Sequence, residues 1–125
     1  MGYNELSKAE QLEAVRSNGH AIQYIDNPSE ELCLEAVKQN GYAFQYISNP
    51  SEEVCLEAVK RNGYAIRFIK NPSLAVQLAA VKEDGYAIQF ISNPSEEICL
   101  EALMNNPNAI KYIKNEYILK QLGVG

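Results

Sequence analysis

The side chains best suited to nucleophilic or metal chemistry in this sequence are three cysteines, Cys33, Cys55 and Cys99, and a single histidine, His20. A cysteine nucleophile requires a nearby base, and a zinc site requires about four ligands. Successive cysteines are 22 and 44 residues apart, and no Cys-x-x-Cys pair occurs. Because ligands and bases are this sparse, the sequence predicts no catalytic residue, no metal site and no cofactor. We therefore expect a protein that is not an enzyme.

Paired glutamates are the next candidates, since two carboxylates can divide the roles of general acid and general base. The pairs are Glu30-Glu31, Glu52-Glu53 and Glu96-Glu97. Each pair lies at the expected start of a helix, where the helix dipole favours negative charge. We interpret them as structural, and as an acidic ridge to which a basic partner could dock.

Tyrosine is the most frequent aromatic residue, with eight copies against three phenylalanines and no tryptophan. The aromatic residues form two series with a common step, namely Tyr42, Tyr64 and Tyr86, then Tyr24, Tyr46, Phe68, Phe90 and Tyr112. Residues four apart share one face of a helix, so both series predict core packing, and His20 joins the first series as a packing residue. Stacking of nucleic-acid bases on a tyrosine groove is the alternative, which the net charge of -5 disfavours.

All of these residues belong to an internal repeat. Glycines recur at Gly19, Gly41, Gly63 and Gly85, and Asn-Pro pairs begin at Asn27, Asn49, Asn71 and Asn93, each 22 residues apart. This step defines five units, 5–26, 27–48, 49–70, 71–92 and 93–114, and we call equivalent positions in successive units a column. Such a period is typical of stacked repeat proteins. The sequence predicts an all-α fold, an α-solenoid of helix-turn-helix repeats in a single domain over 1–125, with a C-terminal cap helix over 115–125.

The first half of each unit predicts a helix of about 11 to 12 residues. Asn27 is the predicted N-cap, Pro28 the first helical residue, and Glu30 the third, where it completes a capping box. In the first unit, Ser7 and Glu10 take the roles of cap and capping-box partner. The apolar arc of this helix is wide, so neighbouring units must cover it.

The end of that helix and the second half of the unit follow from Gly41 and its equivalents. We expect this glycine to stop the helix in a left-handed conformation. In the fifth unit Pro107 takes its place, and we expect Asn106 and Pro107 to be the cap and first residue of the next helix, with a different turn. Residues 42–47 are apolar on most sides, with only Gln45 facing outward, which predicts a short buried helix.

The hydropathy of the chain and its cysteine count bear on its cellular location. No stretch approaches the ~20 apolar residues that cross a bilayer, and the first residues lack the basic and apolar regions of a secretory signal. An odd number of cysteines suits a reducing compartment. We expect a cytoplasmic protein, with its repeat capped at both ends as in a whole protein.

Residues 37–46 read VKQNGYAFQY and residues 59–66 read VKRNGYAI. This motif, V-K-x-N-G-x-A-(I/L)-x-(Y/F), resembles that of a family of short helical repeats classed as a domain of unknown function and found in bacterial, phage and large-virus proteins. The resemblance covers residues 7–114 and departs at Pro107. It implies an all-helical repeat fold and a microbial or phage origin, and it carries over no catalytic or binding residue.

Function is expected where one unit differs from the others. The fourth unit has Leu74, Ala75 and Ala79 where other units have glutamates, and the third unit is the basic one. The predicted partner-binding residues are Lys60, Arg61, Arg67, Lys70, Leu74, Ala75 and Ala79. We expect a protein-protein interaction module, such as a small phage or viral inhibitor that binds a host protein, with self-association left open. The alternative is a nucleic-acid-binding protein that uses the tyrosine series and the basic cluster.

Overall fold

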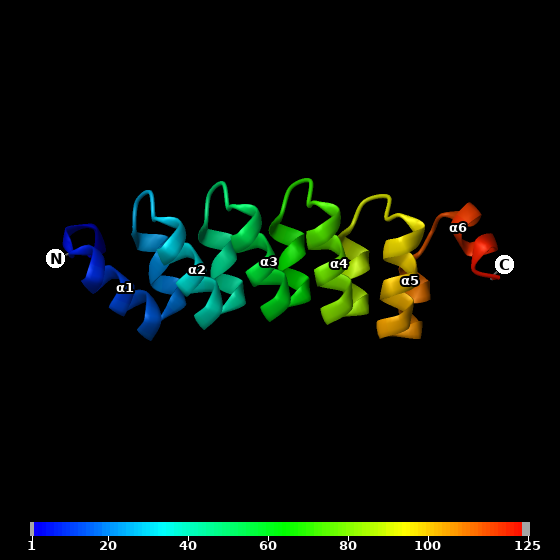
Figure 1. The fold of residues 1–125 in the computed structure, drawn as a ribbon, viewed down its shortest axis with the longest axis horizontal. Coiled ribbons are helices and arrows are strands. Elements are labelled where there is room, and N and C mark those ends of the chain that lie inside the picture. Colours follow the sequence, from blue (N-terminus) through cyan, green and yellow to red (C-terminus); the bar gives the residue numbers. More distant parts are fainter. Residues whose placement is uncertain (1, 124–125) are drawn as a thin grey trace.

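The computed structural model describes residues 2–123 and shows a row of stacked helices (Figure 1). Within those residues α-helices alternate with 3-10 helices, and no strand occurs. The α-helices are α1 (Lys8–Ser17), α2 (Glu30–Gln39), α3 (Glu52–Arg61), α4 (Leu74–Glu83), α5 (Glu96–Asn105) and α6 (Glu116–Gln121). The 3-10 helices are η1 (Tyr3–Glu5), η2 (Gly19–Tyr24), η3 (Gly41–Tyr46), η4 (Gly63–Phe68), η5 (Gly85–Phe90) and η6 (Pro107–Tyr112). The predicted all-α solenoid is confirmed.

Each of the helices α1–α5 has ten residues, slightly fewer than expected, and begins directly after a serine. In α2 the Ser29 hydroxyl accepts a hydrogen bond from the backbone N–H of Leu32 at 3.3 Å. In α1 the full capping box forms, because the Glu10 carboxylate also accepts the N–H of Ser7. The cap predicted in the first unit is therefore confirmed.

The prediction that Asn27 caps the second helix is wrong, and so are the helical positions predicted for Pro28 and Glu30, because Glu30 is the first helical residue. The Asn-Pro pairs form the loops between units instead, and these loops line up along the upper edge of the row in Figure 1. Asn27 has a φ of 47°, and the asparagine of the next three loops adopts the same left-handed conformation. Asparagine tolerates that conformation better than most residues with a side chain, since its short amide can bond locally.

The second half of each unit forms a six-residue 3-10 helix rather than a short α-helix. A single asparagine joins the two helices. The Asn40 N–H donates to the Ala36 carbonyl at 3.0 Å and ends α2, while the Asn40 side chain accepts the N–H of Tyr42 at 2.9 Å and starts η3. Asp84 plays the same part between α4 and η5.

The repeated glycine does not adopt a left-handed conformation, contrary to prediction, since among the glycines described only Gly123 has a positive φ. Gly63 is required by a close approach instead: a Cβ there would lie 2.7 Å from the Ala80 carbonyl oxygen in the next α-helix. Asn106 caps η6 and Pro107 is its first residue, as predicted. The turn is nevertheless that of the other units, because Pro107 is exposed at the end of the row. The different turn predicted there is therefore wrong.

The core runs the length of the row, with a share from every unit. In the third unit α3 contributes Ala58 and Val59, and η4 contributes Ala65 and Ile66, all of them buried. Each of α1–α4 lies against the α-helix of the next unit, and each of α2–α5 also lies against the 3-10 helices on either side. The wide apolar arc of each helix is thus covered by its neighbours, as the sequence predicts.

The two ends of the row differ. At one end α1 presents the exposed Glu10 in a column that is buried and apolar in the next four units, as at Leu32. At the other end α6 lies near the loop edge (Figure 1) and buries Ile118 beside Cys99 and Ile113. The predicted cap helix is shorter than 115–125, and residues 124 and 125, like Met1, lie outside the described part. No helix in the described part is long and apolar enough to span a bilayer.

Candidate functional site

His20 packs between two units, as its column predicts. Its ring stands edge-on to the Tyr46 ring, with 5.5 Å between centroids, and its Nε2 lies 3.0 Å from Nδ2 of Asn40. Over residues 2–123 no group of three histidine, cysteine or acidic side chains is placed to hold a metal ion. The histidine therefore belongs to the packing between units.

The three cysteines are buried in their α-helices. Burial raises the pKa of each thiol, and the glutamate at the start of the same helix, Glu30, Glu52 or Glu96, raises it further. Because the thiolate is the reactive species, the folded protein at pH 8 should react with a thiol reagent such as DTNB about 100-fold more slowly than a free thiol. The absorbance of released thionitrobenzoate checks this, with the guanidinium-unfolded chain as control. A thiol that reacts rapidly in the folded protein would contradict it.

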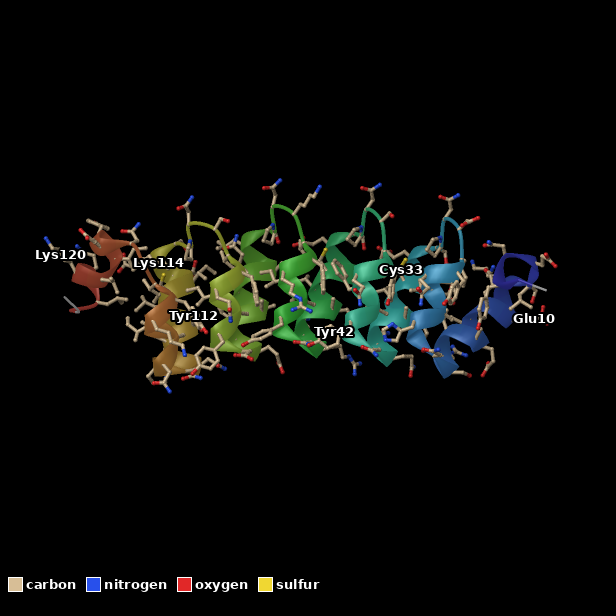
Figure 2. All side chains as sticks on the ribbon, turned by 180° about the vertical axis from the view of Figure 1, so that it is seen from behind. Glu10, Cys33, Tyr42, Tyr112, Lys114 and Lys120 are labelled. Carbon is tan, nitrogen blue, oxygen red and sulfur yellow. The ribbon has the colours of Figure 1, made fainter. Side chains whose placement is uncertain are left out.

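The 3-10 helices and the loops that follow them form one side of the row, residues 18–27, 40–49, 62–71, 84–93 and 106–115, which we call the 3-10 face. Tyr42 and Tyr112 lie on this face in Figure 2. The first aromatic ring of one unit meets the second ring of the next. The edge-on pairs are His20 with Tyr46, Tyr64 with Phe90 at 5.3 Å and Tyr86 with Tyr112 at 5.7 Å. The predicted aromatic series therefore connect neighbouring units.

At two places on the 3-10 face a positively charged side chain lies over aromatic rings. The Arg67 guanidinium is 4.7 Å from the Phe68 centroid and 5.9 Å from that of Tyr42, and Lys111 lies similarly over Tyr86 and Tyr112. In the other units this column holds glutamine, whose amide donates to the carbonyl three residues earlier. The two cations therefore replace a local backbone contact with contacts to aromatic rings.

Exposure divides the aromatic series into two parts. The exposed rings lie in the first three units: Tyr24 at 60%, Tyr42 at 40%, Tyr46 at 38% and Phe68 at 37%. The half-buried rings lie in the last three units and are Tyr64, Tyr86, Phe90 and Tyr112. The prediction of core packing is wrong for the four exposed rings. Together with Arg67 they form what we call the aromatic patch.

Charge also differs between the two sides. Most carboxylates lie on α1–α5, including the glutamate pairs, which occupy first helical turns as predicted. The segments of the 3-10 face carry the cations Arg67, Lys70, Lys111 and Lys114 and the anions Asp26 and Asp84. Asp84 is engaged as a cap, since its side chain accepts the N–H of Tyr86 at 2.9 Å. The negative net charge is thus concentrated on the α-helices, and the 3-10 face is locally basic.

The residues predicted as a partner contact do not form one surface. Lys60 and Arg61 lie at the C-terminal end of α3, whereas Leu74 and Ala75 lie in the first turn of α4. A helix of this length rises about 15 Å, so the basic and apolar members occupy opposite ends of adjacent helices. Ala79 lies midway along α4 and is half-buried. The apolar residues Leu74, Ala75 and Ala79 therefore share one helix, α4, and none of the predicted basic residues lies on it.

The other two predicted residues lie elsewhere. Arg67 belongs to the aromatic patch, and Lys70 lies at the loop edge beside Pro72. The aromatic series was identified from the sequence, but the exposure of its four rings was not predicted, and neither were Leu100 and Met104, which are exposed on α5. The sequence marks each of these surfaces by one unusual residue. Arg67 stands in a column that otherwise holds mostly glutamine, and Met104 stands in a column that otherwise holds arginine or lysine.

A family model described as a domain of unknown function (DUF4116) matches the chain at residues 11–51, 29–74 and 76–118. The matched segments cover most of the chain and include the whole aromatic patch. No curated protein and no solved structure matches the chain.

Proposed function

We propose that this chain, which belongs to the DUF4116 family, is a non-enzymatic module that binds another protein through its aromatic patch. The observation that carries the proposal is the exposure of four aromatic rings over three adjacent units, two of which, Phe68 and Tyr42, have centroids 4.7 and 5.9 Å from the Arg67 guanidinium. Tyrosine and arginine are among the residues most enriched at positions that dominate binding energy in protein interfaces. The patch spans three units, which suits a protein partner better than a small molecule.

The patch is also ordered before a partner arrives. Arg67 lies over Phe68 and Tyr42, and Tyr46 stands edge-on against His20. Side chains that are already fixed lose little conformational entropy on binding, so more of the contact energy becomes affinity. A partner with a carboxylate opposite Arg67 fits this locally basic face.

Single-stranded nucleic acid is the second candidate, favoured by the cations of the 3-10 face. Bases stack on the flat faces of aromatic rings. In the patch Arg67 already lies over Phe68 and Tyr42, and His20 meets Tyr46 edge-on. These contacts favour the protein partner. A narrower proposal rests only on the resemblance of the repeat motif to a family found in bacterial, phage and large-virus proteins: the partner is a cytosolic host protein whose activity the chain modulates.

Arg67→Gln tests the proposal with a residue that the repeat already contains. Gln23, Gln45 and Gln89 occupy this column, so the variant should keep the fold. Immobilised wild-type and variant proteins capture partners from nuclease-treated lysates of the source organism and of its host cell, and mass spectrometry quantifies the captured proteins. We expect a protein that binds wild type and is reduced at least about tenfold by Arg67→Gln, because a central interface arginine is lost.

Lys111→Gln is the matched control, since it makes the same change of residue in the same column outside the patch. Capture by this variant should equal that of wild type. Equal capture by Arg67→Gln and wild type would overturn the proposal. Oligonucleotide binding that falls steeply with salt and is lost in Arg67→Gln, without any captured protein, would instead support the second candidate.

A further inference from the structure

The C-terminal end of the row carries a second exposed apolar surface, which is aliphatic and separate from the aromatic patch. Met104 is 79% exposed and Leu100 is 43% exposed, one turn apart on α5. Leu103 beside them is half-buried, whereas Val81 in the same column is fully buried. Helix α6 closes this end near the loop edge, through Ile118. We call Leu100, Leu103 and Met104 the α5 flank.

In the other units the next α-helix covers this flank. The leucine that matches Leu100 is half-buried in all four of them, whereas Leu100 itself is exposed. The column of Met104 holds arginine or lysine in those units, and Arg16 Nε lies 3.5 Å from the Glu35 carboxylate of the following helix. The flank is therefore shaped to receive a helix, and at Met104 it has an apolar residue in place of a cation.

We propose that the α5 flank binds an amphipathic helix of a partner protein, one with an apolar stripe bordered by lysine or arginine. Helix α5 carries Glu96, Glu97 and Glu101, and among α1–α5 it alone has no lysine or arginine. An apolar stripe with an acidic border is complementary to a helix with an apolar stripe and a basic border. This site is separate from the aromatic patch and does not depend on the function proposed for it.

A second copy of this chain fits the flank less well. Pro107 occupies the glycine column, and at Gly19, Gly63 and Gly85 a Cβ would lie 2.4 to 2.7 Å from a carbonyl oxygen of the next α-helix. Pro107 therefore opposes the stacking of a further unit in register. The outer side of α1 presents Glu10 and Glu13, and a second α5 would present its own glutamates. Either arrangement would place carboxylates opposite the acidic border of α5, which is unfavourable.

The test uses two helix-stabilised peptides with the same apolar stripe, both taken from residues 51–62. One keeps its native glutamates, and the other carries Glu52→Lys, Glu53→Lys and Glu57→Lys. Fluorescence anisotropy follows the binding of each labelled peptide to the full-length protein under reducing conditions. We expect the lysine peptide to bind at least about tenfold more tightly than the glutamate peptide, because its charges oppose those of α5.

Two protein variants locate the binding. Met104→Lys restores the residue type of its column and should weaken binding of the lysine peptide at least about tenfold, since it adds a like charge to the apolar flank. Leu74→Glu also restores the residue of its column, but on α4, and should leave affinity unchanged. Because sister units hold both residues, both variants should fold, which circular dichroism verifies.

Several outcomes would overturn this proposal. They are equal binding of the two peptides, no binding of the lysine peptide at millimolar concentration, and wild-type affinity in Met104→Lys. A wild-type dimer in sedimentation velocity that Met104→Lys converts to a monomer would also overturn it, since the flank would then bind a second copy.

Discussion

Gly63→Ala is expected to lower the free energy of unfolding by about 2 kcal/mol, measured by urea denaturation followed by circular dichroism. A Cβ at this position would lie 2.7 Å from the carbonyl oxygen of Ala80. That oxygen belongs to the backbone of α4, which cannot rotate aside as a flexible side chain does. Helices η4 and α4 must therefore separate, and the packing between the third and fourth units loosens.

Gly41→Ala is the matched control in the same column. The nearest atoms to a Cβ there are the Cβ of Arg61 at 3.3 Å and the Ala58 carbonyl oxygen at 3.6 Å. Alanine also reduces the conformational entropy of the unfolded chain, which stabilises by about 0.4–1 kcal/mol. We therefore expect a net change below about 0.5 kcal/mol. Equal destabilisation by both variants would contradict the account of this glycine as a point of close approach.

The glycine column shows how far the sequence predicts this fold. The 22-residue period correctly predicts a helical solenoid, because every unit repeats the same apolar pattern and the same turn residues. It does not reveal why glycine is needed, since a left-handed turn and a close backbone approach select the same residue. Pro107 in this column was an available signal, because proline cannot adopt a positive φ.

The first residue of each α-helix was also ambiguous in the sequence, because two residues suit the N-cap position. Asn27 and Ser29 are both good caps, and Pro28 suits both a first helical turn and the loop before a helix. The left-handed conformation of Asn27, with a φ of 47°, resolves the choice in favour of Ser29. Such a conformation depends on how two units join, which a local pattern does not report.

The aromatic patch was less predictable than the fold. In an α-helix, Tyr42 and Tyr46 would share one face and pack as a pair within their unit. A 3-10 helix turns 120° per residue, so residues four apart point in different directions and each ring reaches a different neighbouring unit. The helix type therefore explains why the rings contact neighbouring units. It does not explain why only four rings are exposed, since the half-buried rings also lie in 3-10 helices. The cation Arg67 in a glutamine column was the remaining sign of a distinct surface.

Tyr46→Ala combined with Phe68→Ala is expected to weaken partner binding at least about 100-fold, measured by isothermal titration calorimetry with the protein captured by wild type. Both rings are partly exposed, at 38% and 37%, so their removal leaves the fully buried core in place and should cost about 2 kcal/mol of stability. The binding loss is larger because the change removes two aromatic contacts and also the ring beneath Arg67.

This titration is the most direct test of the claim that the exposed rings form the binding surface. It requires a control variant in which other rings of the same face are removed. Tyr86→Ala combined with Tyr112→Ala removes an edge-on pair from the same face, but one that is half-buried and outside the patch. With all proteins shown to be folded by circular dichroism, we predict near wild-type affinity for this control and the large loss for the patch variant. Equal loss in both variants, or wild-type affinity in the patch variant, would contradict the account.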